Sequence, residues 1–160
     1  MLESVFILLS SLMSLFGVTS APEVVPVPNT VEAEVVQVID GDTIDVLLNG
    51  EKARVRYIGI DTPEVYPEYE CFGREAKKAN QDLVTGKLVI LVSGQEDKDK
   101  YDRLLRYVYA GEVFVNEELL KTGMAFAMPV PPNIKYAKDF YKLQKEAKAY
   151  GFGLWSTCDY

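Results

Sequence analysis

Histidine is absent from this chain of 160 residues. Its absence excludes a Ser-His-Asp triad, a Cys-His pair and histidine metal ligands, so acid–base chemistry must fall to carboxylates, Lys, Tyr or Arg. The chain also lacks a basic surplus, because 17 Lys and Arg face 24 Asp and Glu, for a net charge of −7. Nucleic-acid binders are usually basic, so this balance disfavours a broad grip on phosphates while allowing a compact site with a few arginines.

The N-terminal segment lacks both a long hydrophobic run and an early positive side chain. Its apolar run, residues 5–16, falls short of the ~20 residues that a membrane-spanning helix needs. Small residues follow it, and Ala21 stands after a plausible cleavage site, so residues 1–21 are predicted to be a signal peptide. Residues 22–30 are proline-rich and predict a linker. We therefore expect a secreted or extracytoplasmic protein with no membrane association after signal removal, and an N-terminal membrane anchor is the second choice.

Cysteine is scarce: Cys71 and Cys158 are the two in the chain. In an exported protein, a single pair suggests a disulfide. The alternative is two free thiols in a cytosolic protein. The two questions, export and disulfide, depend on each other.

The rest of the chain, residues 31–158, is long enough for one domain, and its hydrophobic pattern alternates as strands do. Turn signals at residues 40–42 and at Asn49-Gly50 separate three strands into a meander. The predicted strands are 31–39, 43–48, 52–60, 88–92, 104–109 and 113–115, the predicted helices are 73–85, 117–121 capped by Asn116, and one from about Tyr136 to Gly151, and 93–102 is predicted to be an exposed loop. This order favours an α+β, mainly β fold, a five-stranded Greek-key barrel of the oligonucleotide-binding (OB) type with three α-helices. The pattern alone also fits other small α+β folds.

Carboxylates gather where predicted strands end. Asp42 and Asp61 follow strand ends on consecutive hairpins, so a meander can bring both to one end of the barrel. Carboxylate oxygens suit a hard cation such as Ca²⁺ or Mg²⁺. Glu64, after Pro63, could serve beside a metal as a general base for water. The plainer alternatives are that Asp42 is a turn residue and Glu64 a solvated loop acid.

Arginines accompany these acids. Arg54 and Arg56 lie two residues apart on one predicted strand and so share a face, and Arg103 begins a later strand. Arginine pairs bidentately with phosphate, so two converging arginines would stabilise charge developing on a phosphoryl group. The alternative is cross-strand salt bridging with the many acids.

Taken together, the charged motifs closely resemble those of the staphylococcal nuclease (thermonuclease) family. They come in the family's order and cover most of residues 31–156. The matching segments are 38–43, 56–64 with an arginine five residues before the aspartate, 99–103, 115–120 and 154–156.

The resemblance implies an OB-type barrel with three helices and Ca²⁺-dependent hydrolysis of DNA and RNA that leaves 3′-phosphates. The substrate would be single-stranded or unpaired nucleic acid, and the protein a monomer with no stable protein partner. The implied Ca²⁺ ligands are the carboxylates of Asp42 and Asp61 and the backbone carbonyl of Thr62. Glu64 would activate or orient water, and Arg56 and Arg103 would bind the scissile phosphate. Lys100 and Tyr101 would contact a terminal phosphate of the substrate.

Three segments depart from the family pattern. Residues 65–70 contain no basic side chain, although the family's best-known member is lysine-rich there, and Glu68 and Glu70 stand in this loop. Pro129 and Pro131 occupy the places of two base-stacking tyrosines, and Asp102 the place of a glycine. These departures predict weak substrate binding with the chemistry intact. The rival functions are a non-catalytic nucleic-acid-binding module and a Ca²⁺-stabilised interaction domain.

Overall fold

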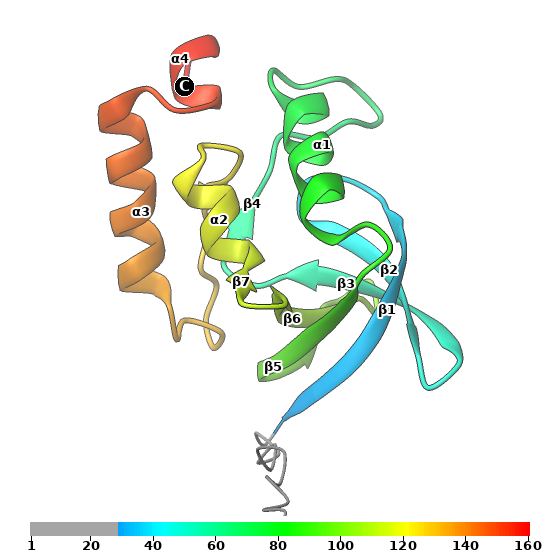
Figure 1. The fold of residues 1–160 in the computed structure, drawn as a ribbon. Helices are drawn as coiled ribbons and strands as arrows, with labels where there is room; N and C mark the ends of the chain where they lie inside the picture. Colours follow the sequence, from blue (N-terminus) through cyan, green and yellow to red (C-terminus); the bar gives the residue numbers. More distant parts are fainter. Residues whose placement is uncertain (1–28) are drawn as a thin grey trace, which may run out of the picture.

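The structure is a computed structural model, and it describes residues 29–160 (Figure 1). The predicted signal peptide, and the predicted linker up to residue 28, lie outside the described residues. In the part of the chain from residue 29 onward, no helix combines the length and the apolar character needed to cross a membrane.

Five strands close into a barrel, as the sequence predicts. The sheet order is β3-β2-β1-β5-β6-β7, and a parallel pairing between β3 and β6 closes it, while the other pairings in this sheet are antiparallel. The strands are β1 (Thr30–Val38), β2 (Thr43–Leu48), β3 (Glu51–Tyr57), β5 (Leu88–Lys98), β6 (Leu104–Ala110) and the short β7 (Val113–Phe114). A separate two-stranded pair joins β4 (Ile60–Asp61) to β8 (Phe126–Ala127).

Alternating apolar side chains fill the barrel. Ile44 and Val46 of β2, and Val89 and Leu91 of β5, are fully buried. Their spacing of two residues points each pair to the inner face of its strand. Each such side chain contributes about 1.5–3 kcal/mol through its removal from water. The barrel therefore has the hydrophobic core that the alternation predicts.

The helices pack together beside the barrel. They are α1 (Gly73–Val84), α2 (Val115–Lys121), α3 (Ala137–Tyr150) and the short α4 (Leu154–Thr157). Figure 1 shows α2 between α1 and α3, and α2 contacts both. Gly151 ends α3 at a φ of 66°, a left-handed conformation that glycine adopts without strain.

In the sheet, two predicted segments differ from the structure by several residues. The strand predicted over 52–60 is broken after Tyr57, because the chain turns at Gly59 (φ 78°), where an added Cβ would lie 2.8 Å from the ring of Phe140. The loop predicted over 93–102 is largely strand, since β5 continues to Lys98. A distant residue supports this extension: Asn133 Oδ1 accepts hydrogen bonds from the N–H groups of Gln95 and Glu96.

Asn116 does not cap α2 as predicted. The helix begins at Val115, two residues earlier than predicted, and the Asn116 side chain is fully buried. It accepts a hydrogen bond from Val108 N–H at 3.0 Å and donates to the Ile58 carbonyl at 2.9 Å. Asn116 therefore connects α2 by hydrogen bonds to β6 and to the turn that precedes β4, the strand that contains Asp61.

Candidate active site

Asp42 is a buried carboxylate at the entrance of β2, with 3% of its surface exposed. Thr43 Oγ1 donates to its Oδ1 at 3.0 Å, and the backbone N–H of Thr62 donates to its Oδ2 at 2.9 Å. Gly41 allows this approach, because a Cβ there would lie 2.6 Å from Thr62 Oγ1. Asp42 and Thr62 are thus adjacent although twenty residues separate them, and Asp42 is more than a turn residue.

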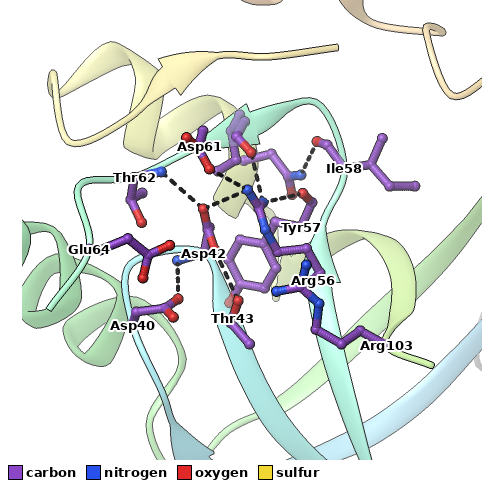
Figure 2. Close-up of polar contacts among 12 residues, drawn as sticks. Asp40, Asp42, Thr43, Arg56, Tyr57, Ile58, Asp61, Thr62, Glu64 and Arg103 are labelled. Carbon is purple, nitrogen blue, oxygen red and sulfur yellow. Dashed lines mark hydrogen bonds and ion pairs between the residues drawn. The ribbon is translucent and has the colours of Figure 1, made fainter. Parts of the chain in front are cut away.

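Arg56 joins the two carboxylates that the sequence predicts as metal ligands (Figure 2). Its Nη2 lies 3.0 Å from Asp42 Oδ2 and 2.6 Å from Asp61 Oδ1. Its Nη1 donates to the carbonyls of Tyr57 (2.8 Å) and Ile60 (2.7 Å). The guanidinium is therefore held from four sides at the end of the barrel.

Arg54 forms a cross-strand salt bridge with Asp45, which is the alternative that the sequence left open for the arginines. Its Nε and Nη2 donate to the two oxygens of Asp45 at 2.7 and 3.1 Å, and Lys52 Nζ lies 2.8 Å from the same carboxylate. The two arginines of β3 thus have different partners, and of the two Arg56 alone contacts Asp42 and Asp61.

Negative charge is concentrated around Arg56. Burial raises the pKa of Asp42 to about 7, Arg56 opposes this rise, and the charges of Asp40 and Asp61 add to it. Burial also raises the pKa values of Asp61 and Glu64, and the Asp40 charge raises both further. The charge of Arg56 thus acts on Asp42, Asp61 and Glu64, and Asp40 adds negative charge beside them; a divalent cation would relieve this repulsion.

The donors present fit a hard cation. Asp42 and Asp61 offer carboxylate oxygens, and Thr62 lies against Asp42 with its own backbone carbonyl, the ligand types that Ca²⁺ and Mg²⁺ take. Between residues 29 and 160, no three acidic or cysteine side chains converge into a preformed metal cluster. A cation here would therefore depend on two carboxylates completed by backbone carbonyl and water oxygens.

Glu64 lies on the loop after β4, with its side chain exposed. Figure 2 shows its carboxylate beside Asp40 and Asp42. Its backbone N–H donates to Glu70 Oε2 at 2.9 Å, and Glu70 N–H donates to the Glu64 carbonyl at 3.0 Å. Glu64 is thus at the edge of the acidic cluster on a closed loop, where water can reach it.

Arg103 and Arg56 line the same pocket, which has a volume of about 210 Å³. Asp99 holds Arg103 in place: its Oδ2 accepts from Arg103 Nε at 2.7 Å, and its Oδ1 accepts from Arg103 N–H at 3.0 Å. Because Asp99 takes the Nε edge, the two terminal nitrogens of Arg103 are the part that can meet a phosphate. Met128 and Val130 add apolar lining to this pocket.

Lys100 and Tyr101 lie in the exposed turn before Arg103. Tyr101 N–H donates to Asp99 Oδ1 at 2.9 Å, and the Tyr101 ring centre lies 5.5 Å from the Arg103 guanidinium and 5.0 Å from Lys100 Nζ. Asp102, at the place of a glycine in the family, has a φ of 65°. The turn therefore keeps the left-handed conformation that a glycine would favour, without the glycine.

The predicted disulfide between Cys71 and Cys158 is present, with a Cα–Cα distance of 6.0 Å. It ties the loop before α1 to the C-terminus, and Tyr160 Oη donates to the Cys71 carbonyl at 3.3 Å. The sequence alone does not indicate that Glu70, Met128 or Val130 belongs to the site. The resemblance marked these segments only as departures, and no local pattern indicates which distant groups they meet.

The fold and the site define a class: an OB-type barrel with a carboxylate cluster at one end and two arginines lining the adjoining pocket. The family model described as staphylococcal nuclease homologue matches residues 54–157, a range that begins after Asp42. The chain belongs to the staphylococcal nuclease family, as the motifs predict.

Several known proteins share this sequence pattern. The chain is 43% identical over 127 residues to endonuclease YncB of Bacillus subtilis (strain 168), covering 76% of this chain and 60% of that protein. It is 39% identical over 127 residues to the thermonuclease of Staphylococcus hyicus, covering 78% of this chain and 75% of that protein. It is also 39% identical over 153 residues to an uncharacterized endonuclease of Haemophilus influenzae, covering 94% of this chain and 78% of that protein. The chain spans 60% of YncB and 43% of the related B. subtilis endonuclease YokF.

Proposed function

We propose that this chain is a Ca²⁺-dependent phosphodiesterase that hydrolyses DNA and RNA and leaves 3′-phosphate ends. One observation carries the proposal: Arg56 contacts the Asp42 and Asp61 carboxylates and also lines one pocket with Arg103. The relatives named endonuclease and thermonuclease support the same class of reaction.

In this mechanism Glu64 takes a proton from a water molecule whose oxygen forms a bond to the phosphorus. The bond from phosphorus to the 5′-oxygen breaks, the 5′-oxygen takes a proton from solvent, and the phosphate stays on the 3′-oxygen. Glu64 suits this role because it is exposed at the edge of the acidic cluster, on the loop that follows the Asp61 strand.

Arg56 and Arg103 bind the phosphoryl oxygens and stabilise the charge that develops on them. Asp99 and the backbone carbonyls hold the two guanidinium groups in place before substrate arrives. A Ca²⁺ ion held by Asp42, Asp61 and the Thr62 carbonyl would supply further positive charge beside the phosphate. Lys100 and Tyr101, next to Arg103, would contact a terminal phosphate.

The substrate is proposed to be single-stranded or unpaired nucleic acid, bound weakly by a monomer. The acidic balance of the chain and the non-aromatic Pro129 and Pro131 both reduce grip, since base stacking is worth ~1–3 kcal/mol per base. A secreted or extracytoplasmic location is proposed as well, and the Cys71–Cys158 disulfide supports an oxidising compartment.

Two substitutions near the start of β2 test the metal role. In Asp42→Ala, Ca²⁺ binding measured by calorimetry should weaken at least ~10-fold and hydrolysis should nearly cease, because a ligand carboxylate is lost. Asp45→Ala is the matched control: Asp45 is also a buried aspartate near the start of β2, but its partners are Arg54 and Lys52. Equal Ca²⁺ affinity in the two variants would contradict the assignment.

A further inference from the structure

We propose that Glu70 is a positioning residue for Glu64, and that the C-terminus holds Glu70 in place through the Cys71–Cys158 disulfide. The proposal rests on the proposed function, in which Glu64 activates water. It adds a role that the sequence motifs do not assign to Glu70, to the disulfide or to the C-terminal residues.

Glu64 and Glu70 close the loop between them with two hydrogen bonds of opposite direction. Glu64 N–H donates to the Glu70 carboxylate at 2.9 Å, and Glu70 N–H donates to the Glu64 carbonyl at 3.0 Å. Glu70 thus contacts Glu64 through its side chain at the N–H and through its own backbone N–H at the carbonyl, so it restrains the backbone on both sides of the Glu64 Cα. The direction in which the Glu64 carboxylate leaves the backbone is thereby fixed relative to Asp42 and Asp61.

The closed loop also packs directly on the start of α1. Gly73 N–H donates to the Glu70 carbonyl at 3.1 Å. An added Cβ at Gly73 would lie 2.5 Å from the Glu64 carbonyl oxygen, so backbone meets backbone there. The loop is therefore seated on a helix whose position the core determines.

The C-terminus forms the other side of this arrangement. Cys71, next to Glu70, is bonded to Cys158, and Tyr160 Oη donates to the Cys71 carbonyl. The Tyr160 ring packs edge-on against Phe126, with ring centres 4.9 Å apart, and Phe126 pairs with Asp61 across β8 and β4. The last residues of the chain thus brace both the Glu64 loop and the strand that carries Asp61.

The two acids of the loop accordingly have different roles. A carboxylate at position 70 places negative charge near Asp61 and Glu64, which alone would repel a polyanion. Its contact with the Glu64 N–H favours catalysis in the proposed mechanism, because the hydrogen bond that Glu70 accepts holds the base in place. Glu68 is exposed in the same loop and is the natural comparison.

Steady-state cleavage of single-stranded DNA with Ca²⁺ separates positioning from charge. Glu70→Ala should lower kcat about 10-fold or more with a smaller change in KM, because a misplaced base slows the chemical step. Glu70→Gln keeps an accepting oxygen without the charge and should restore kcat to within about 3-fold. Glu68→Ala, the matched control, should leave kcat within about 2-fold, since it removes only a loop charge. Native kcat in Glu70→Ala, or equal loss in the Gln and Ala variants, would overturn the proposal.

A second measurement is independent of activity. Amide hydrogen exchange at Glu64 should quicken about 10-fold in Glu70→Ala and stay near the native rate in Glu70→Gln, because the N–H loses its acceptor only in the former. Unchanged exchange in the alanine variant would overturn the positioning role even if the protein cleaves nothing. An inactive native protein with this exchange pattern would instead count against the proposed function alone.

The role of the C-terminus is tested by Cys71→Ser/Cys158→Ser, assayed at a temperature where circular dichroism shows it folded. Its kcat should fall in the same direction as that of Glu70→Ala, and Glu64 amide exchange should quicken. Native kcat and native exchange in the folded double variant would show that the disulfide does not hold the loop.

Discussion

Arg56 has contacts that no other cationic side chain could reproduce. Its two terminal nitrogens reach two carbonyls and two carboxylates that belong to three different segments: the turn before β2, the end of β3, and β4. Lysine has one nitrogen on a flexible stem and lacks the planar fork. Arg103 is likewise held by a side-on contact with Asp99 through its Nε, which leaves its two terminal nitrogens for the proposed phosphate contact.

Arg56→Lys and Arg103→Lys should each lower kcat at least ~100-fold while the protein stays folded, because charge remains but the fork is lost. Arg54→Lys is the matched control on the same strand, since Arg54 pairs with Asp45 outside the pocket. Initial rates on single-stranded DNA give the comparison. A native rate in either variant would make that arginine structural, and an equal loss in Arg54→Lys would point to the strand instead of the site.

At the scale of elements, the hairpin of β2 and β3 carries Arg56 of the candidate site and also a separate group of ion pairs around Asp45. Asp45 is 1% exposed and meets Arg54 and Lys52 from the neighbouring strand. The hydrogen bond from Arg54 holds the pKa of Asp45 below its ordinary value of 3.8. A carboxyl group with a lowered folded-state pKa stabilises the fold once it is ionised.

The pH dependence of this pair has a definite sign. Its stabilisation is fully present above the ordinary pKa of 3.8 and is lost as pH falls through the lower folded-state pKa. Asp45→Asn should therefore cost about 1–2 kcal/mol of unfolding free energy at pH 6, and the difference should shrink below about pH 3. Urea unfolding at both pH values measures it. A difference that grows on acidification would contradict the assignment.

Asn116 shows what a distant contact does for an element. Asn116→Ala leaves the Val108 N–H and the Ile58 carbonyl without their buried partner, which should cost about 2–4 kcal/mol. Thermal or urea unfolding gives the number. A loss under about 1 kcal/mol would mean that water replaces the side chain there.

The elements that follow from local pattern were predictable, and those that depend on partners were not. Period-two alternation and turn residues predict β1 and β2, and helical spacing that ends before Gly86 predicts α1, each within one residue of the observed ends. The extension of β5 to Lys98 depends on Asn133, which lies far along the chain, and a polar run looks the same in a loop. Asparagine is a residue type common at helix N-caps, so the sequence favours a cap at Asn116. Only its contacts with Val108 and Ile58 in the folded structure show its buried role.

At the scale of the whole molecule, the C-terminus returns to the end of the barrel that carries the site. The Cys71–Cys158 bond closes a separation of 87 residues. The motif order predicted which acids and arginines gather, because strand ends on one meander meet. The motifs do not predict that Glu70 accepts a hydrogen bond from Glu64 or that Met128 lines the pocket, because these contacts depend on how the loops pack against the folded barrel.

Reduction of the disulfide should destabilise the protein by up to about 4.6 kcal/mol, the chain-entropy contribution of a loop of this length, less any native strain. Urea unfolding with and without a reductant measures the loss. Cys71→Ser/Cys158→Ser is the control, because its stability should not respond to the reductant. Two alkylatable thiols in the natively folded, oxidised protein would contradict the bond.

The central claim is that this chain cleaves nucleic acid with a metal held at Asp42 and Asp61. The most direct test incubates the purified protein with end-labelled single-stranded DNA, in Ca²⁺ or in excess chelator, and identifies the product ends. We predict cleavage in Ca²⁺ that leaves 3′-phosphates, and none in chelator. Undiminished cleavage in chelator, or binding without cleavage in Ca²⁺, would contradict the account.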